Sequence, residues 1–102
     1  NRLPDSAKKE MTAKETALLA ANKRAITVPL EVARLSHQVL ELAVDLVNRG
    51  NPNSVSDVGV AGEVAYAGVR GGSLNVYINL PAVDSDQKFI VEVKKEVELL
   101  LQ

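Results

Sequence analysis

The chain lacks several of the residue types from which common functional sites are built. Its 102 residues contain no cysteine, which excludes a disulfide scaffold and thiolate metal sites. His37 is the single histidine, which argues against a zinc centre built from histidines. Lysine and arginine total 12 against 13 acidic residues, so no basic excess exists to neutralise a phosphate backbone. We therefore expect no nucleic-acid partner.

Long apolar runs and aromatic side chains are also scarce. No apolar run approaches the length of a membrane span and no signal-peptide pattern stands at the N-terminus, so we expect a soluble, cytoplasmic protein without a membrane partner. Aromatic residues make up 3% of the chain and hydrophobic residues 46%, so valine, leucine and alanine must build the core. A compact domain of this length would have a radius of gyration of about 13 Å. All six glycines fall between residues 50 and 72.

Two helices separated by a proline are predicted in the first half of the chain. Residues 6–26 contain neither glycine nor proline and are rich in residues that favour helix. Pro29 disfavours helical backbone at Val28, so we expect the chain to break or kink at Thr27 and Val28. A second helix over 29–49 carries two apolar seams, which is typical of a bundle helix with two partners. The first seam is Leu30, Ala33, His37, Leu40, Val44 and Val47, and the second is Val32, Leu35, Val39, Leu42 and Leu46.

The segment from 55 to 83 fits two different secondary structures. Apolar residues alternate with polar ones from 74 to 80 and follow two adjacent glycines, which predicts a β-hairpin within 58–80. Read as a helix, the segment places its small residues on one stripe with Asp57, Asn75 and Asn79. Such a stripe would let another helix approach closely. Periodicity alone does not choose between these structures.

Turn and capping residues bound the helices of the second half. Residues 50–54 suit a turn, and Ser54 with Asp57 fits a capping box at the start of a helix. Asp84 with Gln87 repeats the pattern and begins a final amphipathic segment over 84–102. One face of that segment carries Phe89, Val93, Val97 and Leu100.

Two strings of residues resemble those of a known enzyme family. Residues 50–61 read GNPNSVSDVGVA, which resembles the signature loop and helix start of the formiminotetrahydrofolate cyclodeaminase and methenyltetrahydrofolate cyclohydrolase family. Residues 74–80, LNVYINL, resemble the family's second recognisable string. Residues 28–30 and 2–4 are similar to weaker landmarks in the same order, so the likeness covers nearly the whole chain.

The resemblance implies an all-α fold and favours one long buried helix over 55–83. We therefore expect a multihelical bundle to which residues 1–102, as a single domain, contribute about four helices, with an α+β fold as the alternative. The family's domain is larger, and its N-terminal half carries a Pro-Gly-Gly-Gly-Ser type segment that is absent here. The chain thus resembles the C-terminal half of such a domain. Its expected partners are the missing N-terminal half and, in a homodimer or higher oligomer, further copies.

The resemblance also implies chemistry at the one-carbon unit of a reduced folate. A cyclodeaminase converts formiminotetrahydrofolate to methenyltetrahydrofolate and ammonia, whereas a cyclohydrolase opens the methenyl bridge with water to give formyltetrahydrofolate. Both transfer protons and pass through a cationic centre that a carboxylate would stabilise, and neither needs a metal or an organic cofactor. We expect the cyclodeaminase reaction, with the cyclohydrolase reaction and a non-catalytic helical interaction module as alternatives.

Asp57 is the candidate catalytic carboxylate because it lies in the matching string and begins the small-residue stripe, although it could serve only as a helix cap. The candidate substrate-binding residues are Asn51, Asn53, Ser54, Asn75 and Asn79. Turn chemistry would also explain the first three, and contact with another helix would explain the last two, which we expect to be buried. His37 stands one turn before Glu41, which could hold its ring, and we expect it to be a packing residue.

Overall fold

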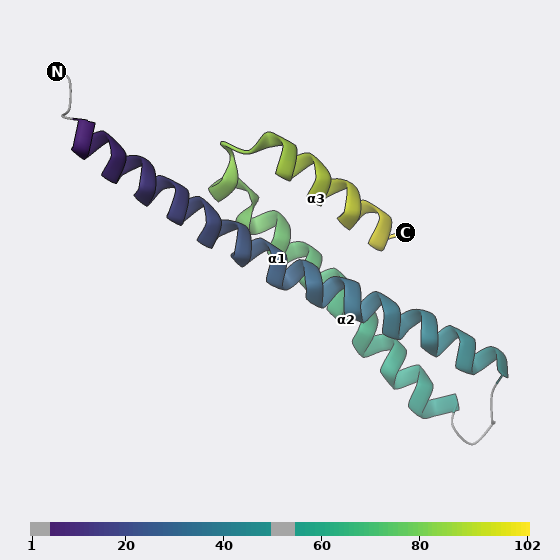
Figure 1. The fold of residues 1–102 in the computed structure, drawn as a ribbon. Helices are drawn as coiled ribbons and strands as arrows, with labels where there is room; N and C mark the ends of the chain where they lie inside the picture. Colours follow the sequence, from purple (N-terminus) through teal and green to yellow (C-terminus); the bar gives the residue numbers. More distant parts are fainter. Residues whose placement is uncertain (1–4, 50–54) are drawn as a thin grey trace.

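Three α-helices and one short 3₁₀ helix make up the part of the chain that can be described. The computed structural model describes the backbone of residues 5–49 and 55–102, and the side chains of 12–49 and 56–102. Helix α1 spans Asp5–Arg49 and α2 spans Val55–Asn79. The 3₁₀ helix η2 covers Leu80–Val83, and α3 spans Gln87–Leu100. Figure 1 shows α1 and α2 side by side as a long hairpin, with α3 folded back along one side of it.

The prediction of a break at Thr27 and Val28 is wrong, because α1 continues through Pro29 without interruption. A proline inside a helix removes one hydrogen bond and costs about 3 kcal/mol. Packing offsets that cost here, since Ile26, Leu30 and Ala33 around the proline are at most 2% exposed. The two helices expected in the first half are therefore one, and residues 5–49 and 55–102 supply three α-helices rather than four.

Residues 55–79 form a helix, and no strand occurs among the described residues, so the hairpin alternative is wrong and the all-α prediction is confirmed. The alternation that imitated a strand has a simple cause. Val76 and Leu80 face the core, whereas Leu74 and Ile78 lie on the opposite side of the helix, 62% and 72% exposed. Because both sides of this segment are apolar, its hydrophobic pattern resembles that of a strand. The helix is accordingly buried on one side only.

Two glycines let α2 lie almost against the backbone of α1. A Cβ atom added at Gly72 would come within 2.6 Å of the Pro29 carbonyl oxygen and 3.2 Å of the Ala33 Cβ atom. One added at Gly68 would come within 2.9 Å of the Ser36 Cβ atom. The predicted close approach along the small-residue stripe is therefore confirmed at these two positions.

The core lies where α3 covers the α1–α2 pair. Its buried residues come from every helix: Ile26, Leu30, Val76, Leu80, Val83, Ile90, Val93 and Val97. Phe89 and Leu100 pack against this cluster partly exposed, so the predicted apolar face of the last segment is confirmed. The prediction that Asp84 caps the last helix is wrong. Asp86 caps α3, and its side chain accepts a hydrogen bond of 3.1 Å from the Phe89 amide.

The described structure is a rod rather than a compact domain. It measures 73 × 18 × 17 Å and has a radius of gyration of 19.7 Å, well above the value expected from chain length alone. The 45 residues of α1 account for the length, since a helix rises about 1.5 Å per residue. None of the described helices combines the length and apolarity needed to cross a membrane.

Candidate functional site

Asp57, Asn75 and Asn79 share one side of α2 but lie at opposite ends of it. The 18 positions from Asp57 to Asn75 correspond to five helical turns, which returns to the same side about 27 Å along the axis. A single copy of the described structure therefore does not bring the candidate carboxylate and the candidate amides together.

The local environments of these residues differ from the burial that the sequence predicted. Asp57 and Asn75 are exposed, and only Asn79 is half-buried. The Asn79 side-chain amide donates a hydrogen bond of 2.8 Å to the Asn75 carbonyl oxygen one turn earlier. The expectation of two buried amides is therefore wrong, since the Asn75 side chain is exposed and the Asn79 amide is bound within its own helix. Asn51, Asn53 and Ser54 lie outside the described residues.

His37 contacts Glu41 as its spacing predicted, with 3.1 Å between His37 Nδ1 and Glu41 Oε1. The pair borders a cavity of about 480 Å³ between α1, α2 and the end of α3. Tyr66 and Arg70 form the opposite wall, with the Arg70 guanidinium 5.6 Å from the centre of the Tyr66 ring. Of the predicted site residues that the structure describes, Asp57, Asn75 and Asn79, none lines this cavity. In the sequence, the spacing of four between Tyr66 and Arg70 indicated that these two side chains lie on the same side of a helix.

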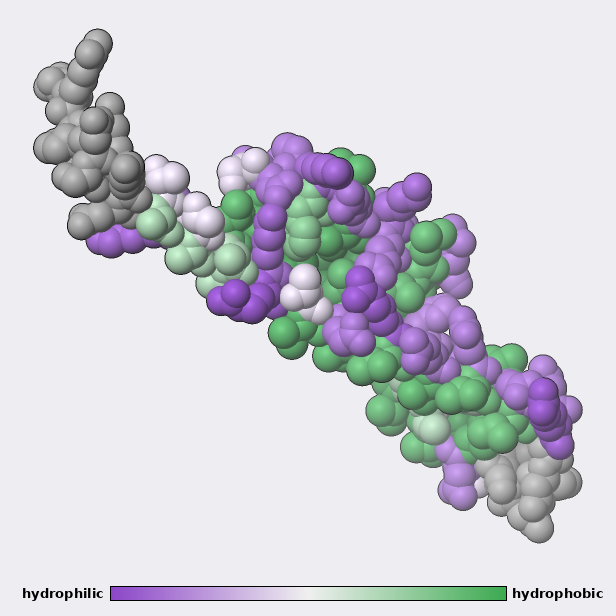
Figure 2. Space-filling view, viewed as in Figure 1, coloured by the Kyte–Doolittle hydropathy of each residue, from purple (hydrophilic) through white to green (hydrophobic). Residues whose placement is uncertain are grey.

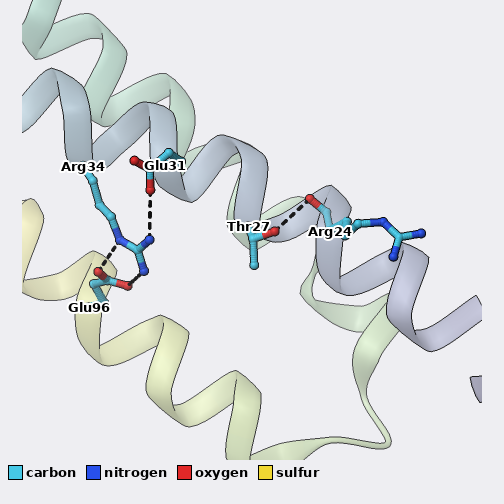
Figure 3. Close-up of polar contacts among 5 residues, drawn as sticks. All are labelled: Arg24, Thr27, Glu31, Arg34 and Glu96. Carbon is cyan, nitrogen blue, oxygen red and sulfur yellow. Dashed lines mark hydrogen bonds and ion pairs between the residues drawn. The ribbon is translucent and has the colours of Figure 1, made fainter.

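Two ion pairs that sequence reasoning missed hold α3 against α1. Arg34 donates two hydrogen bonds to the carboxylate of Glu96, the longer being 2.7 Å, and a third of 3.0 Å to Glu31 (Figure 3). The bonds from Arg34 lower the pKa of Glu96, against the opposing effect of burial, and the same bonds raise the pKa of Arg34. Lys23 pairs with Asp86 at the start of α3. These partners are more than sixty positions apart in sequence, so no local pattern indicates them.

The side of the hairpin that α3 leaves free is apolar over most of its length. We call the α1 part of it the α1 seam and the α2 part the α2 seam. The α1 seam is Val28, Val32, Leu35, Val39, Leu42 and Leu46; the α2 seam is Val60, Val64, Ala67, Gly71, Leu74 and Ile78. Every one of these residues is exposed. A groove lined by Leu35, Val39, Ala61 and Val64 joins the two seams.

Hydrophobic surface is also exposed where α1 and α2 extend past the end of α3 (Figure 2). Soluble proteins rarely leave contiguous apolar patches of more than a few hundred Å² facing water. The two seams and this extension therefore have the character of surfaces that pack against further protein. In the described part of the chain, no group of three or more histidine and carboxylate side chains is placed to hold a metal ion.

Comparison with known families finds one family model that matches nearly the whole chain. The model of the formiminotransferase-cyclodeaminase family matches residues 1–99. The chain belongs to this family. The resemblance of residues 50–61 and 74–80 is thereby confirmed at the level of the whole chain. No solved structure matches the chain.

Relatives in the formiminotransferase-cyclodeaminase family carry two different names. The methenyltetrahydrofolate cyclohydrolase of Methylorubrum extorquens is 41% identical over 99 residues, which cover 97% of this chain and 47% of that protein. The formimidoyltransferase-cyclodeaminases of Rattus norvegicus and Mus musculus are each 31% identical over 101 residues, or 18% of their length. The match lies in the C-terminal part of these proteins. The chain thus spans about half or less of the length of these relatives.

Proposed function

We propose that the chain is the C-terminal half of a domain that acts on the one-carbon unit of a reduced folate. The observation that carries the proposal is the family match over residues 1–99. Between the two reactions, the higher identity to the cyclohydrolase favours hydrolysis of methenyltetrahydrofolate to formyltetrahydrofolate. Cyclisation of formiminotetrahydrofolate with loss of ammonia, the reaction expected first from the sequence, is the second candidate, supported by the 31% identity to the bifunctional enzymes.

Asp57 is the residue we assign to the cationic centre. Hydrolysis adds a water oxygen to the methenyl carbon, breaks one carbon–nitrogen bond and releases one proton to a base. An ionised carboxylate beside the methenyl carbon would stabilise its positive charge, and its effect would grow once water is excluded. Asp57 is exposed in the described structure. The proposed site therefore needs further protein to close over it.

The α1 seam is where we place the N-terminal half of the domain. The seam residues recur at alternating spacings of four and three, the pattern by which one helix packs along another. The side chains of Leu35 and Val39 are 52% and 43% exposed, although α1 is already packed on α2 and α3. Covering such side chains stabilises by about 25 cal/mol for each Å² removed from water. An added helical layer on the α1 seam would thus remove these exposed apolar side chains from water.

The two candidate reactions are separated by assaying the intact protein with each folate. Consumption of methenyltetrahydrofolate, followed as loss of the absorbance of the methenyl species, would identify the cyclohydrolase. Gain of that absorbance from formiminotetrahydrofolate, with release of ammonia, would identify the cyclodeaminase. Lack of turnover together with lack of folate binding in calorimetry would instead favour the helical interaction module and reject the proposal.

A variant pair tests the role of Asp57. Asp57→Ala should lower kcat by about 100-fold or more if the carboxylate stabilises the cationic centre. Glu63→Ala removes another exposed carboxylate of α2 and should leave kcat within about twofold. Full activity of Asp57→Ala would refute the catalytic assignment while leaving the family assignment intact.

A further inference from the structure

The cavity between α1, α2 and the end of α3 is a pocket that the proposed function does not use. Its volume of about 480 Å³ lies within the range of small-molecule pockets, which runs from about 300 to about 1,000 Å³. Tyr66 lines the cavity and follows Asp57 by nine positions, which correspond to two and a half helical turns. The two side chains therefore stand on opposite sides of α2, and a ligand in the cavity does not meet Asp57 of the same copy.

The lining of the cavity is suited to an apolar body. Its apolar side chains come from all three α-helices and the residue that follows α3: Leu40, Val44, Val69, Leu100 and Leu101. Val69 is buried, whereas Val44 and Leu101 are 61% and 47% exposed. A ligand that covered the exposed side chains would remove apolar surface from water, which favours binding.

One wall of the cavity presents a positive charge without an acidic partner. Arg70 is exposed and forms no ion pair with any residue that the structure describes. Its guanidinium lies 5.6 Å from the centre of the Tyr66 ring, and this contact holds the group in place without neutralising its charge. Guanidinium groups bind carboxylates through two parallel hydrogen bonds. Arg70 is thus placed to bind the carboxylate of a ligand whose body lies in the cavity.

The opposite wall limits the charge that such a ligand can carry. The distance of 3.1 Å between His37 Nδ1 and Glu41 Oε1 holds the Glu41 carboxylate on the α1 side of the cavity. Among the described residues that line the cavity, Arg70 is the single lysine or arginine. A phosphate group carries about two negative charges at neutral pH, so one arginine would leave it incompletely paired near Glu41. A ligand with a single carboxylate matches these charges better.

We propose that this cavity binds an amphipathic monocarboxylate, with its carboxylate on Arg70 and its apolar body against Leu40, Val69 and Leu100. The site is separate from the one assigned to Asp57, so the proposal does not rest on the proposed function. Because α1, α2 and the end of α3 all line the cavity, a bound ligand would also hold the end of α3 against the hairpin and stabilise the folded protein.

Titration of the intact protein with phenylpropionate tests the charge recognition, and phenylpropionamide is the uncharged control of the same shape. In calorimetry the acid should bind about tenfold or more tightly than the amide, and Arg70→Gln should abolish this preference. Arg24→Gln is the matched control, because Arg24 is also exposed but lies outside the cavity, and it should bind the acid like wild type. Equal affinities for acid and amide, or a preference that survives Arg70→Gln, would overturn the proposal.

Filling the cavity tests where the apolar body lies. Val44→Trp adds bulk to the wall and should abolish binding of phenylpropionate, whereas Val91→Trp, at a position on α3 that is equally exposed but outside the cavity, should not. Far-ultraviolet circular dichroism checks that both variants fold. Unchanged binding by a folded Val44→Trp protein would overturn the assignment to this cavity.

Competition with folate separates this proposal from the proposed function. Neither methenyltetrahydrofolate nor formiminotetrahydrofolate should displace bound phenylpropionate from the intact protein, and displacement by either would overturn the claim of a separate site. A protein that converts a folate but does not bind phenylpropionate would overturn this proposal alone. A protein that binds phenylpropionate but neither binds nor converts either folate would overturn the proposed function and support this one.

Discussion

Replacing Gly72 by alanine tests how closely α2 approaches α1. The added Cβ atom would lie 2.6 Å from the Pro29 carbonyl oxygen and 3.1 Å from the Ala33 nitrogen, which are backbone atoms that no rotamer change can move. Inserting a methyl group into such a contact costs up to about 3 kcal/mol. Alanine favours helix over glycine by about 1 kcal/mol. We therefore expect a net loss of about 2 kcal/mol in the free energy of unfolding.

Gly59→Ala is the matched control, because it lies in the same helix with no atom within 4 Å of the added Cβ position. It should stabilise the protein by up to about 1 kcal/mol through helix propensity alone. The two variants should then differ by about 3 kcal/mol in urea unfolding of the intact protein, followed by circular dichroism. Equal stabilisation by both variants would refute the close approach of the two helices at Pro29.

Three further outcomes follow from the core, the ion pairs and the seams. Ile26→Ala should lower the free energy of unfolding by about 2–5 kcal/mol because Ile26 is 0% exposed, whereas Val91→Ala, 63% exposed, should change it by less than about 0.5 kcal/mol; equal effects in denaturant unfolding would contradict the assigned core. The pKa of Glu96 is lowered in the folded protein, so Glu96 stabilises the fold fully at pH values above 4.5, the ordinary pKa of a glutamate. This stabilisation is lost as the pH falls through the lowered pKa. Stability curves of wild type and Glu96→Gln should therefore converge in acid, and a constant gap between them from pH 7 to pH 3 would rule out this linkage. Val39→Asp should destabilise the intact protein or make it aggregate if, as we propose, further helices cover the α1 seam; thermal unfolding indistinguishable from wild type would mean that the seam faces water.

The end of α1 and the apolar face of α3 were predictable from the sequence, because turn residues and amphipathic spacing act over a few neighbouring positions. Helix α1 ends at Arg49, directly before the glycine, asparagine and proline from which a turn was predicted, and α3 has the amphipathic face that its sequence predicts. Helix 55–79 was ambiguous by periodicity, since both of its sides are apolar, and only family resemblance decided it correctly. Pro29 was misjudged because local propensity does not include the packing of Gly72 and Ala33 around it.

The arrangement of the candidate site was likewise predictable from the sequence only in part. A sequence shows that Asp57 and Asn75 lie on one side of a helix, because a spacing of 18 is a whole number of turns. It does not show that Asp57 and Asn75 are exposed, or that the Arg34–Glu96 pair joins helices 62 positions apart. Exposure and distant pairing depend on which faces meet, and that is fixed only when the helices pack.

The sequence by itself determined the family, the absence of thiolate chemistry and the helical character of the segments outside 55–83, because these depend on residue types and on strings or spacings of nearby residues. Tertiary structure decided that α1 is one helix, that α3 covers one side of the hairpin, and that two apolar seams remain uncovered. The physical reason is that burial is a property of pairs of surfaces. A seam of valines and leucines in a sequence predicts a buried surface. Only the packed helices show which seam is buried within the described structure and which is exposed.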